Sequence, residues 1–481
     1  MNPQTRAVRA LNRFGLGARA GEASTLGDPK GWLLDQLEDP PPSVVGDVPD
    51  EDEVWVRIGA FRERQRARDR EGAQEAGRRM RELYRREARL LLDTRVTTER
   101  PFVERLVAFW SNHLCISVGA TAVVAPLAGL YERQAVRPHV LGRFEEMVLA
   151  SVRHPAMLVY LDNFRSIGPD SAAARLVRQN RNRELGLNEN YARELLELHT
   201  LGLDGGYGQG DVEELARLLT GWTVPSLLPW RRAQLERMGR DGSGARGPGS
   251  QRGPGRGDGD ESEPGFAFLS VLHDPGEKAV LAGRYGEGQA EGERAIRDLC
   301  RHPATADFVA GKLARHFLSE EPAARDVEAL ASVFRATGGD LSAVAARLVE
   351  LETAWDPDTR LFRTPQDWLV AVLRAVHHDE APDRATGVLR QLRHTVWAPD
   401  APRGYPDGAR SWADPDSLMN RAELARSLAG QAPRDDLRPE RLLSVLELSG
   451  DDPLPALVHD ETIGARERLA LVLGGPAFQW R

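Results

Sequence analysis

The chain has 481 residues, 41% of them hydrophobic and 28% charged, and its formal net charge is −8. A chain of this length can bury a large core without a disulfide framework. Its two cysteines, Cys115 and Cys300, are too few and too widely spaced for a zinc site, and we expect both to be buried as small hydrophobic residues. With 64 basic and 72 acidic residues, the composition argues against a general nucleic-acid-binding protein.

The N-terminal part holds no segment with the length and composition of a membrane span. Its first residues lack the long apolar core of a signal peptide, and the apolar run 116–130 is short and contains glycine and proline. We therefore expect a cytoplasmic protein without a transmembrane segment. Residues 54–93 mix arginine and glutamate at helical spacing, which predicts a solvent-facing helix or helical hairpin rather than a nucleic-acid surface.

Residues 97–114, TTERPFVERLVAFWSNHL, predict a helix that starts with a threonine cap. Leu106, Phe109, Trp110 and His113 share one side of this helix at helical spacing. His113 is therefore expected to be buried. Two interpretations stay open, a hydrogen-bonded core histidine and a residue of a functional site.

Residues 186–222 contain a helix, a glycine-rich turn and a second helix. The first helix is expected to run from Glu189 to about His199, because Asn188 is a suitable N-cap and glycines follow the helix. The second helix is expected to start near Asp211, with leucines at core spacing.

The first of these two helices has a polar face. Asn190, Glu194 and Glu197 recur at spacings of four and three residues and lie on that face, with Arg193 beside them. The pattern is typical of a solvated surface, and it is also compatible with carboxylates that point into an enclosed site.

A low-complexity segment interrupts the second half of the chain. Residues 236–264 are rich in Gly, Arg, Ser and Pro and have almost no large apolar side chains, which predicts a disordered insertion. The insertion separates a first helical part, residues 1–235, from a second, residues 265–481. Around it we predict one mainly α-helical domain of many helices, with a possible small β-hairpin.

That hairpin is predicted within residues 266–283, where FAFLSVL and KAVLAG flank a turn that carries His273 and Asp274. Two helices broken at His154-Pro155 are expected before the central stretch, and His302-Pro303 is expected to cap a later one. Further helices are predicted at 322–336, 340–354, 364–377, 418–429 and 464–472, with an aromatic, proline-rich loop at 395–417.

The chain resembles a bacterial family of proteins of unknown function, the one catalogued under number 1800. The resemblance rests on NENYARELLELHTLG followed by GGYGQGDVEELARLLTGW, and on LNRFGLG, LVAFWSNHL, LHDPGEKAVLAG, HPATADFVAGKLARHF and LGGPAFQWR. It spans nearly the whole chain and implies candidate site positions, but no reaction. It also implies that relatives are often exported and are often encoded beside a sulfatase-like protein, which would be a candidate partner.

One interpretation of the polar residues is a site for a divalent metal ion. His113, His199 and His273 are the candidate ligands, because imidazoles and carboxylates that converge from helices build such sites. The spacing fits only in part. Glu194 and His199 are five residues apart, so an ideal helix would place His199 with the leucines unless the helix unwinds at its end.

A second interpretation needs no metal. Glu194 and Glu197, one turn apart, would share a proton and act as acid and base, while Arg193 would hold an anionic substrate group. Trp110 and Trp222 would line the substrate site. Asn190 would contact the substrate as well.

A third interpretation is structural, since Asn190, Arg193 and Glu194 would also form a buried polar network that fixes helix packing. Two functions follow as hypotheses. The first is a hydrolytic or metal-dependent enzyme that uses the Glu and His residues of 186–222. The alternative is a non-enzymatic binding or assembly protein that partners the sulfatase-like protein.

Overall fold

The computed structural model describes residues 3–181, 186–228, 265–376, 381–430, 438–448 and 450–481. Over these residues the protein is mainly α-helical with two small two-stranded sheets, which confirms the predicted fold class. The predicted disordered insertion, 236–264, lies outside the described residues. None of the described helices is long and apolar enough to cross a membrane.

The helices before residue 229 are α1 (Pro3–Arg9), α2 (Pro29–Asp35), α3 (Glu51–Arg66), α4 (Arg70–Thr97), α5 (Pro101–His113), α6 (Val124–Tyr131), α7 (Phe144–Arg153), α8 (Pro155–Tyr160), α9 (Ala172–Arg181), α10 (Asn190–Glu194) and α11 (Gln209–Leu218). Those after residue 264 are α13 (Gln289–Arg301), α14 (Pro303–Phe317), α15 (Ala324–Thr337), α16 (Leu341–Glu350), α17 (Pro365–Ala375), α18 (Ala385–Gln391), α19 (Pro415–Ala429), α20 (Pro439–Leu442), α21 (Leu454–His459) and α22 (Ala465–Gly474).

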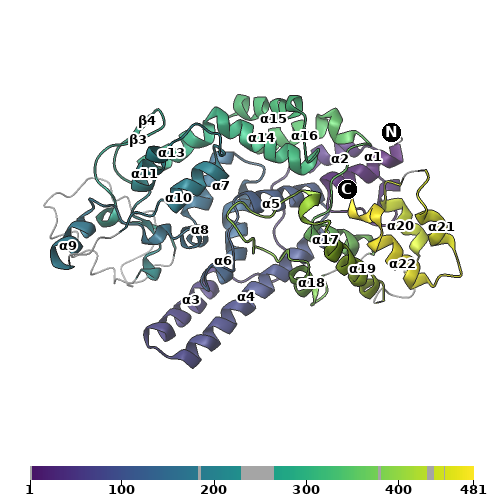
Figure 1. Cartoon of the computed structure of the whole chain (residues 1–481), viewed down its shortest axis with the longest axis horizontal. Coiled ribbons are helices and arrows are strands. Elements are labelled where there is room, and N and C mark those ends of the chain that lie inside the picture. Colours follow the sequence, from purple (N-terminus) through teal and green to yellow (C-terminus); the bar gives the residue numbers. More distant parts are fainter. Residues whose placement is uncertain (1–2, 182–185, 229–264, 377–380, 431–437, 449) are drawn as a thin grey trace.

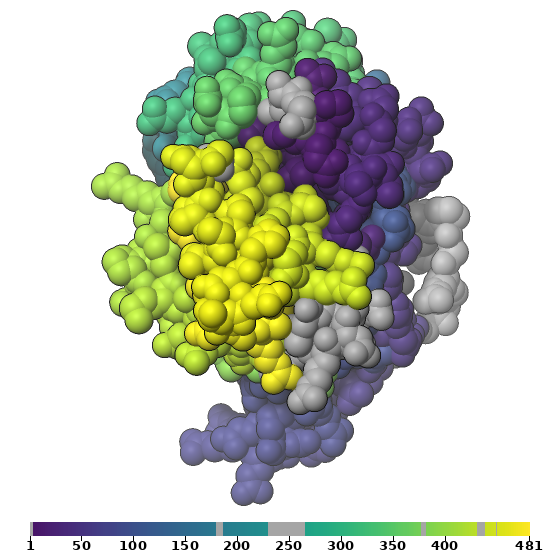
Figure 2. Space-filling view, turned by 90° about the vertical axis from the view of Figure 1, so that its right-hand side faces the viewer, coloured from purple at the N-terminus to yellow at the C-terminus, as the bar shows by residue number. Residues whose placement is uncertain are grey.

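These helices form an elongated body. Helices α9, α11 and α13 lie toward one end of it, and α19 to α22 form the other end, close to both chain termini (Figure 1). Viewed from that second end, the C-terminal residues cover much of the surface beside the N-terminal residues (Figure 2). The pair α3–α4 projects from the body as an antiparallel arm (Figure 1), so the charged segment 54–93 is a helical hairpin, one of the two predicted forms.

Five helices start at a proline whose preceding residue caps the helix with its side chain. Proline is preorganised for the first helical position, and the capping atom accepts an otherwise unpaired backbone N–H. The caps are Asp28 for α2, His154 for α8, His302 for α14, Thr364 for α17 and Asp414 for α19. The predicted break at His154-Pro155 and the predicted cap at His302-Pro303 are both confirmed.

Two hydrophobic clusters form the core. The larger one joins side chains between residues 10 and 355, from both sides of the 229–264 segment. The second joins residues 7–23 and 88–96 to α17, α18, α19 and α22. The C-terminal part of the chain therefore packs on the N-terminal helix and on the far end of α4.

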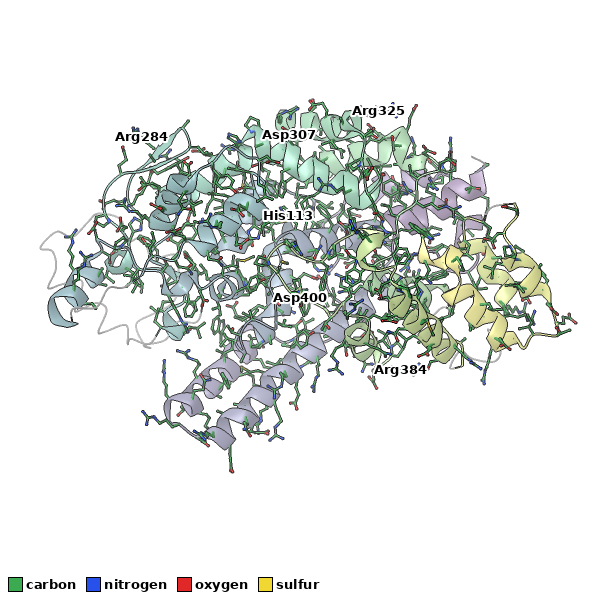
Figure 3. The ribbon with its side chains drawn as sticks, in the orientation of Figure 1. His113, Arg284, Asp307, Arg325, Arg384 and Asp400 are labelled. Atoms are coloured by element: carbon green, nitrogen blue, oxygen red, sulfur yellow. The ribbon has the colours of Figure 1, made fainter. Side chains whose placement is uncertain are left out.

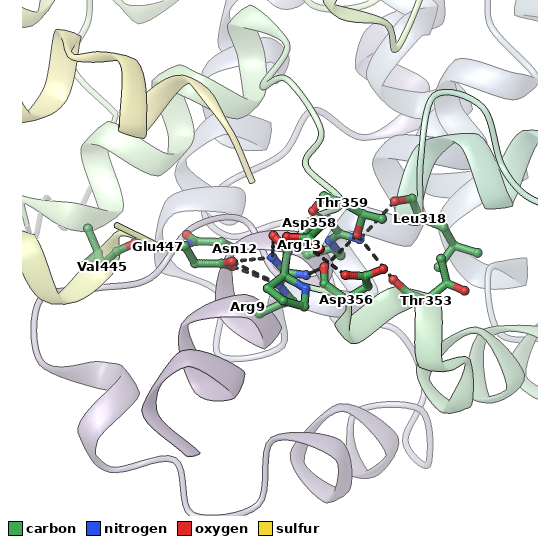
Figure 4. A network of polar contacts seen from close by, with 11 residues as sticks. Arg9, Asn12, Arg13, Leu318, Thr353, Asp356, Asp358, Thr359, Val445 and Glu447 are labelled. Atoms are coloured by element: carbon green, nitrogen blue, oxygen red, sulfur yellow. Dashed lines mark hydrogen bonds and ion pairs between the residues drawn. The ribbon is translucent and has the colours of Figure 1, made fainter. Parts of the chain in front are cut away.

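Polar contacts reinforce this junction (Figure 4). The Arg9 Nε donates to both carboxylate oxygens of Glu447, at 3.2 and 3.1 Å, and the same guanidinium donates to the carbonyl of Asp356. The Asn12 amide donates to the carbonyl of Val445 at 2.8 Å. Residues more than 400 positions apart are thus held together at one end of the molecule.

The strands pair differently from the predicted hairpin. Strand β2 (Ala267–Phe268) is antiparallel to β1 (Trp222–Thr223), while β3 (Lys278–Val280) is antiparallel to β4 (Gly283–Tyr285). FAFLSVL is therefore not the partner of KAVLAG. A single turn of 3₁₀-helix, Ser270–Leu272, ends the first segment, and a two-residue connection lets β3 pair with the residues that follow it. In the sequence, His273 and Asp274 lie between β2 and β3.

Candidate functional site

His113 is the last residue of α5 and is 2% exposed, which confirms its predicted burial. Figure 3 shows it near the middle of the molecule. Its ring is parallel to that of Phe109 and edge-on to that of Trp110. Its Nε2 lies 3.1 Å from the carbonyl oxygen of His199, and since a carbonyl only accepts, Nε2 carries the proton. The buried Nδ1 is then a bare acceptor, with no partner among the described residues.

His199 is the last residue of the helix predicted over residues 189–199, and this helix changes from α-helical to π-helical geometry along its length. The backbone is α-helical over Asn190–Glu194 and then π-helical over Leu195–His199. A π turn is the kind of departure from an ideal helix that rotates a terminal side chain, and such turns are frequent at functional sites. The His199 ring lies 6.4 Å from the His113 ring, centroid to centroid, and its Nε2 also lacks a partner in the described part of the chain.

Both imidazoles are neutral at physiological pH. Burial, reinforced by the positive charge of Lys312, lowers the pKa of His113 well below its ordinary value. The same two causes lower the pKa of His199 to about 3. Each ring therefore offers a basic nitrogen instead of a charge.

The turn after His199 depends on a glycine. Gly202 has a φ of +79°, and a Cβ atom there would lie 2.7 Å from the Phe308 ring. We expect Gly202→Ala to lower the free energy of unfolding by more than the roughly 1–3 kcal/mol of left-handed strain alone, because the Phe308 ring must also move. Gly206→Ala is the matched control, since Gly206 has a φ of +81° with nothing within 4 Å of its Cβ position. Equal losses in chemical denaturation would contradict the role given to Phe308.

A cavity of about 280 Å³ opens beside His113. Its walls come from the end of α5, from α14 and from the loop 403–408, part of the predicted aromatic, proline-rich segment. A smaller cavity of about 80 Å³ adjoins it, and Phe109, Asn112, Tyr405 and Asp407 line both. Together they have room for a small organic molecule and several waters.

The loop 403–408 is fastened to α5 and its following residues. The Asn112 side chain donates to the carbonyl of Tyr405 at 2.8 Å and accepts from its N–H at 2.7 Å, as a neighbouring strand would. Gly404 allows this approach, since its φ is +80° and a Cβ there would lie 2.4 Å from the Asn112 carbonyl oxygen. The Cys115 thiol donates to Pro402 at 3.0 Å. These hydrogen bonds hold the loop in place and so fix one wall of the cavity.

Charges around the main cavity are paired unevenly. Its two carboxylates have partners: Asp407 lies 2.7 Å from His316 Nδ1, and Glu320 accepts from the Ala409 N–H at 2.7 Å. Its three cationic side chains, by contrast, make no hydrogen bond or ion pair with any described residue. These are Lys312, Arg315 and Arg403. The three cationic side chains outnumber the two carboxylates on the cavity wall, so the lining carries a small formal excess of positive charge.

Lys312 lies one turn after Phe308 on α14, with its Nζ 5.6 Å from the centre of the Phe308 ring. The side chain is half-buried. Burial lowers the pKa of its ammonium to about 8, against the opposing charge of Asp407. The ammonium therefore loses its proton more readily than that of a solvent-exposed lysine.

A carboxylate–imidazole pair connects the two cavities. Asp407 lines both, and His316 lines the smaller one and donates to Asp407 from Nδ1. Burial lowers the pKa of His316 although Asp407 opposes the shift, and the buried Nε2 has no partner in the described structure. The carboxylate fixes the tautomer of the ring and leaves Nε2 as a third imidazole nitrogen without a partner in the described structure.

The predicted acidic residues lie on the polar face of the central helix. Asn190 is exposed. Arg193 lies between Glu189 and Glu197 at 3.5 and 3.8 Å, with 37% of its side chain exposed, so these contacts form a surface ladder. Glu194 is half-buried, and burial together with the charge of Glu197 raises its pKa. None of these side chains lines either cavity.

The remaining predicted residues are dispersed. Trp110 packs on the ring of His113 and is 1% exposed. Trp222 is fully buried against Phe266, away from both cavity linings. His273 is held by the Thr220 carbonyl at 2.9 Å from Nδ1 and by the Gly288 N–H at 3.1 Å from Nε2, so neither nitrogen is free.

A metal ion would need more donors than these residues supply. Within the described residues, no group of three or more His, Cys, Asp or Glu side chains is placed to hold one. His113 and His199 each offer one free nitrogen, whereas both nitrogens of His273 are engaged. This arrangement does not fit a complete metal centre, and no chemical step is assigned to a metal here.

Sequence reasoning missed Lys312, Arg403 and Asp407. One signal was available, because Lys30, Lys278 and Lys312 are the only lysines among the 64 Lys and Arg residues. Lysine differs from arginine in that its amine can lose its proton, so the few lysines of an arginine-rich chain are positions to inspect. The convergence of Lys312 with Asp407 had no local signal, since the two lie in separate elements.

The comparisons with known proteins bear out the resemblance found in the motifs. The family described as Protein of unknown function (DUF1800) matches residues 9–480. Neither the curated proteins nor the solved structures give a match. Because the family match spans almost the entire length, the chain belongs to the family Protein of unknown function (DUF1800).

Proposed function

We propose that this protein is an enzyme that binds a small anionic molecule in the main cavity and acts on it by proton transfer. The observation that carries the proposal is the unpaired Lys312, which faces a cavity of about 280 Å³ together with two further unpaired cations. Lys312 makes no direct hydrogen bond or ion pair with the described residues, and an anionic ligand in contact with the half-buried ammonium would supply one. The clustered positive potential would also attract such a ligand.

The proton-transfer part rests on the bare imidazole nitrogens. His113 lines the same cavity as Lys312, its ring is neutral, and its Nδ1 has no partner among the described residues. A neutral imidazole can accept a proton, and because the His113 Nδ1 is buried, the ring or the cavity wall must shift for it to reach a ligand or a water beside the ligand. We assign His113 the role of general base and Lys312, Arg315 and Arg403 the role of binding the anionic group.

The aromatic residues of loop 395–417 do not favour the alternative of a binding surface. Trp412 is 5% exposed, and its Nε1 donates to the carbonyl of Pro406 at 2.7 Å. Trp397 is half-buried, and its Nε1 donates to Glu132 at 3.1 Å. Both side chains support the cavity wall instead of forming an exposed patch. A sulfatase-like partner stays a prediction.

The binding step is tested by titrating phosphate, sulfate and malonate into the full chain while the melting temperature is recorded. At least one of these anions should raise the melting temperature of the wild type, and the increase should level off at high anion concentration. Lys312→Met should lower the affinity for that anion about tenfold or more, as expected for the loss of a charge-assisted contact. Lys30→Met is the control, since Lys30 lies over the Trp355 ring and does not line the cavity. Equal affinities for wild type and Lys312→Met would overturn the proposal.

The catalytic step is tested with the same protein and p-nitrophenyl acetate and phosphate, which report hydrolysis directly. His113→Gln removes the basic nitrogen and should abolish turnover while the anion still raises the melting temperature. Anion binding without turnover of either ester by the wild type would refute hydrolysis at this site. Turnover unchanged in His113→Gln would refute the role of His113.

A further inference from the structure

Lysine is rare in this chain, and each lysine has a distinct environment. Only Lys30, Lys278 and Lys312 occur among the 64 Lys and Arg residues. Lys30 is exposed over the ring of Trp355. Lys278 is fully buried and donates to the carbonyl of Asp274. Lys312 alone faces a cavity and makes no hydrogen bond or ion pair with the described residues.

An amine offers chemistry that a guanidinium does not. Arginine stays protonated and binds anions as well as lysine does, so charge alone does not explain a lysine at this position. A lysine can lose its proton and use the free electron pair as a nucleophile. Burial of the side chain favours the neutral form, and the cationic Arg315 adds to this effect, whereas the nearby Asp407 opposes it.

The cavity also supplies the groups that such a reaction needs. Arg315 and Arg403 are unpaired cations on its wall that would hold a carboxylate. His113 lines the same cavity, and, beyond the effect of burial, its ring is near enough to Lys312 for the ammonium charge to lower the His113 pKa. Asp407, paired with His316, faces the same space.

We infer that Lys312 is a catalytic nucleophile that forms an imine with the carbonyl carbon of a small oxo acid. The inference rests on the proposed binding of an anion in this cavity. The Nζ electron pair attacks the carbonyl carbon, and the carbonyl oxygen takes up a proton to give a carbinolamine. Water then leaves, and a C=N bond joins Nζ to the substrate. Nζ gives up one proton when the carbinolamine forms and the second when water leaves, so both protons depart with the carbonyl oxygen as water, and no oxidant or reductant takes part.

The test traps this bond by reduction in the full chain. Wild type is incubated with pyruvate and sodium cyanoborohydride, and the product is analysed by intact mass and peptide mapping. One adduct per chain is expected, on Lys312, with Lys30 and Lys278 as unmodified internal controls. Lactate carries a hydroxyl group where pyruvate carries its keto group, so lactate should give no adduct.

Lys312→Arg separates the imine from anion binding. This variant keeps a cation, so pyruvate and lactate should still raise its melting temperature, whereas the adduct should disappear. Circular dichroism and melting confirm that the variant is folded. If pyruvate stabilises the wild type and no adduct forms on Lys312, or if Lys30 is labelled equally, the imine is refuted and anion binding stands. If pyruvate and all the other anions leave the wild-type melting temperature unchanged, both proposals are refuted.

Discussion

Asp367→Asn should lower the free energy of unfolding by about 3–5 kcal/mol, because it leaves buried arginines without their counter-ion. The Asp367 carboxylate lies 3.1 Å from Arg105 and 3.6 Å from Arg481, and the side chains of both arginines are 2% exposed. Arg105 belongs to α5, so the pair ties α17 to the helix that carries His113. Urea denaturation of wild type and variant measures the difference.

The control for this substitution is Asp307→Asn on α14. Asp307 pairs with Arg335 at 2.7 Å, but 57% of its side chain is exposed, and Figure 3 shows it on the outer side of the molecule. Asp307→Asn should lower the free energy of unfolding by less than about 1 kcal/mol. Equal losses for the two substitutions would contradict the importance given to burial.

The same carboxylate gives the protein an acid sensitivity with a defined direction. Burial alone would raise the pKa of Asp367, but the charges of Arg105 and Arg481 hold it well below its ordinary value. Since the unfolded-state pKa is about 3.9, the ion pairs contribute fully above about pH 4 and the contribution is lost as the pH falls below that range. Wild type should therefore lose stability faster than Asp367→Asn on acidification below pH 4, so that the difference between them shrinks.

Arg137→Met should have an effect of similar size, about 3–5 kcal/mol, because it leaves two buried carboxylates side by side. Arg137 binds Glu104 at 3.1 Å and Glu132 at 3.0 Å, and the three side chains are 5%, 0% and 1% exposed. Adding Glu104→Gln and Glu132→Gln to the variant should restore much of the loss, since the repulsion disappears. Failure of this triple variant to recover stability would show that packing, and not charge, is lost with Arg137.

The effect of Arg137→Met should reach the cavities. Glu132 also accepts hydrogen bonds from Ser111 and from the Trp397 indole, both at 3.1 Å, and both donors line the smaller cavity. Anion affinity should therefore fall along with stability. Arg79→Met is the control, because Arg79 forms an exposed pair with Glu75 one turn away on the α3–α4 arm. Its cost should be a few tenths of a kcal/mol, with no change in affinity.

Features that depend on contacts between residues close in the chain could be predicted from the sequence. The break at His154-Pro155 and the cap at His302-Pro303 follow from the fixed φ of proline and from a side chain that reaches an N–H two residues on. The burial of His113 follows from its spacing to Phe109 and Trp110 on one helix. These are interactions within about one helical turn, so their signals stand in the local sequence.

The strand partners and the cavity, by contrast, arise from contacts between residues far apart in the chain. Ala267–Phe268 of FAFLSVL pair with Trp222–Thr223, more than 40 residues earlier. This pairing depends on which distant segments pack together, and the local sequence does not specify that. His113, Lys312 and Asp407 converge from α5, from α14 and from a loop almost 300 residues after His113. Their meeting is set by the packing of whole helices and by the hydrogen bonds of Asn112 to Tyr405, and long-range contacts of this kind leave no local periodicity to read.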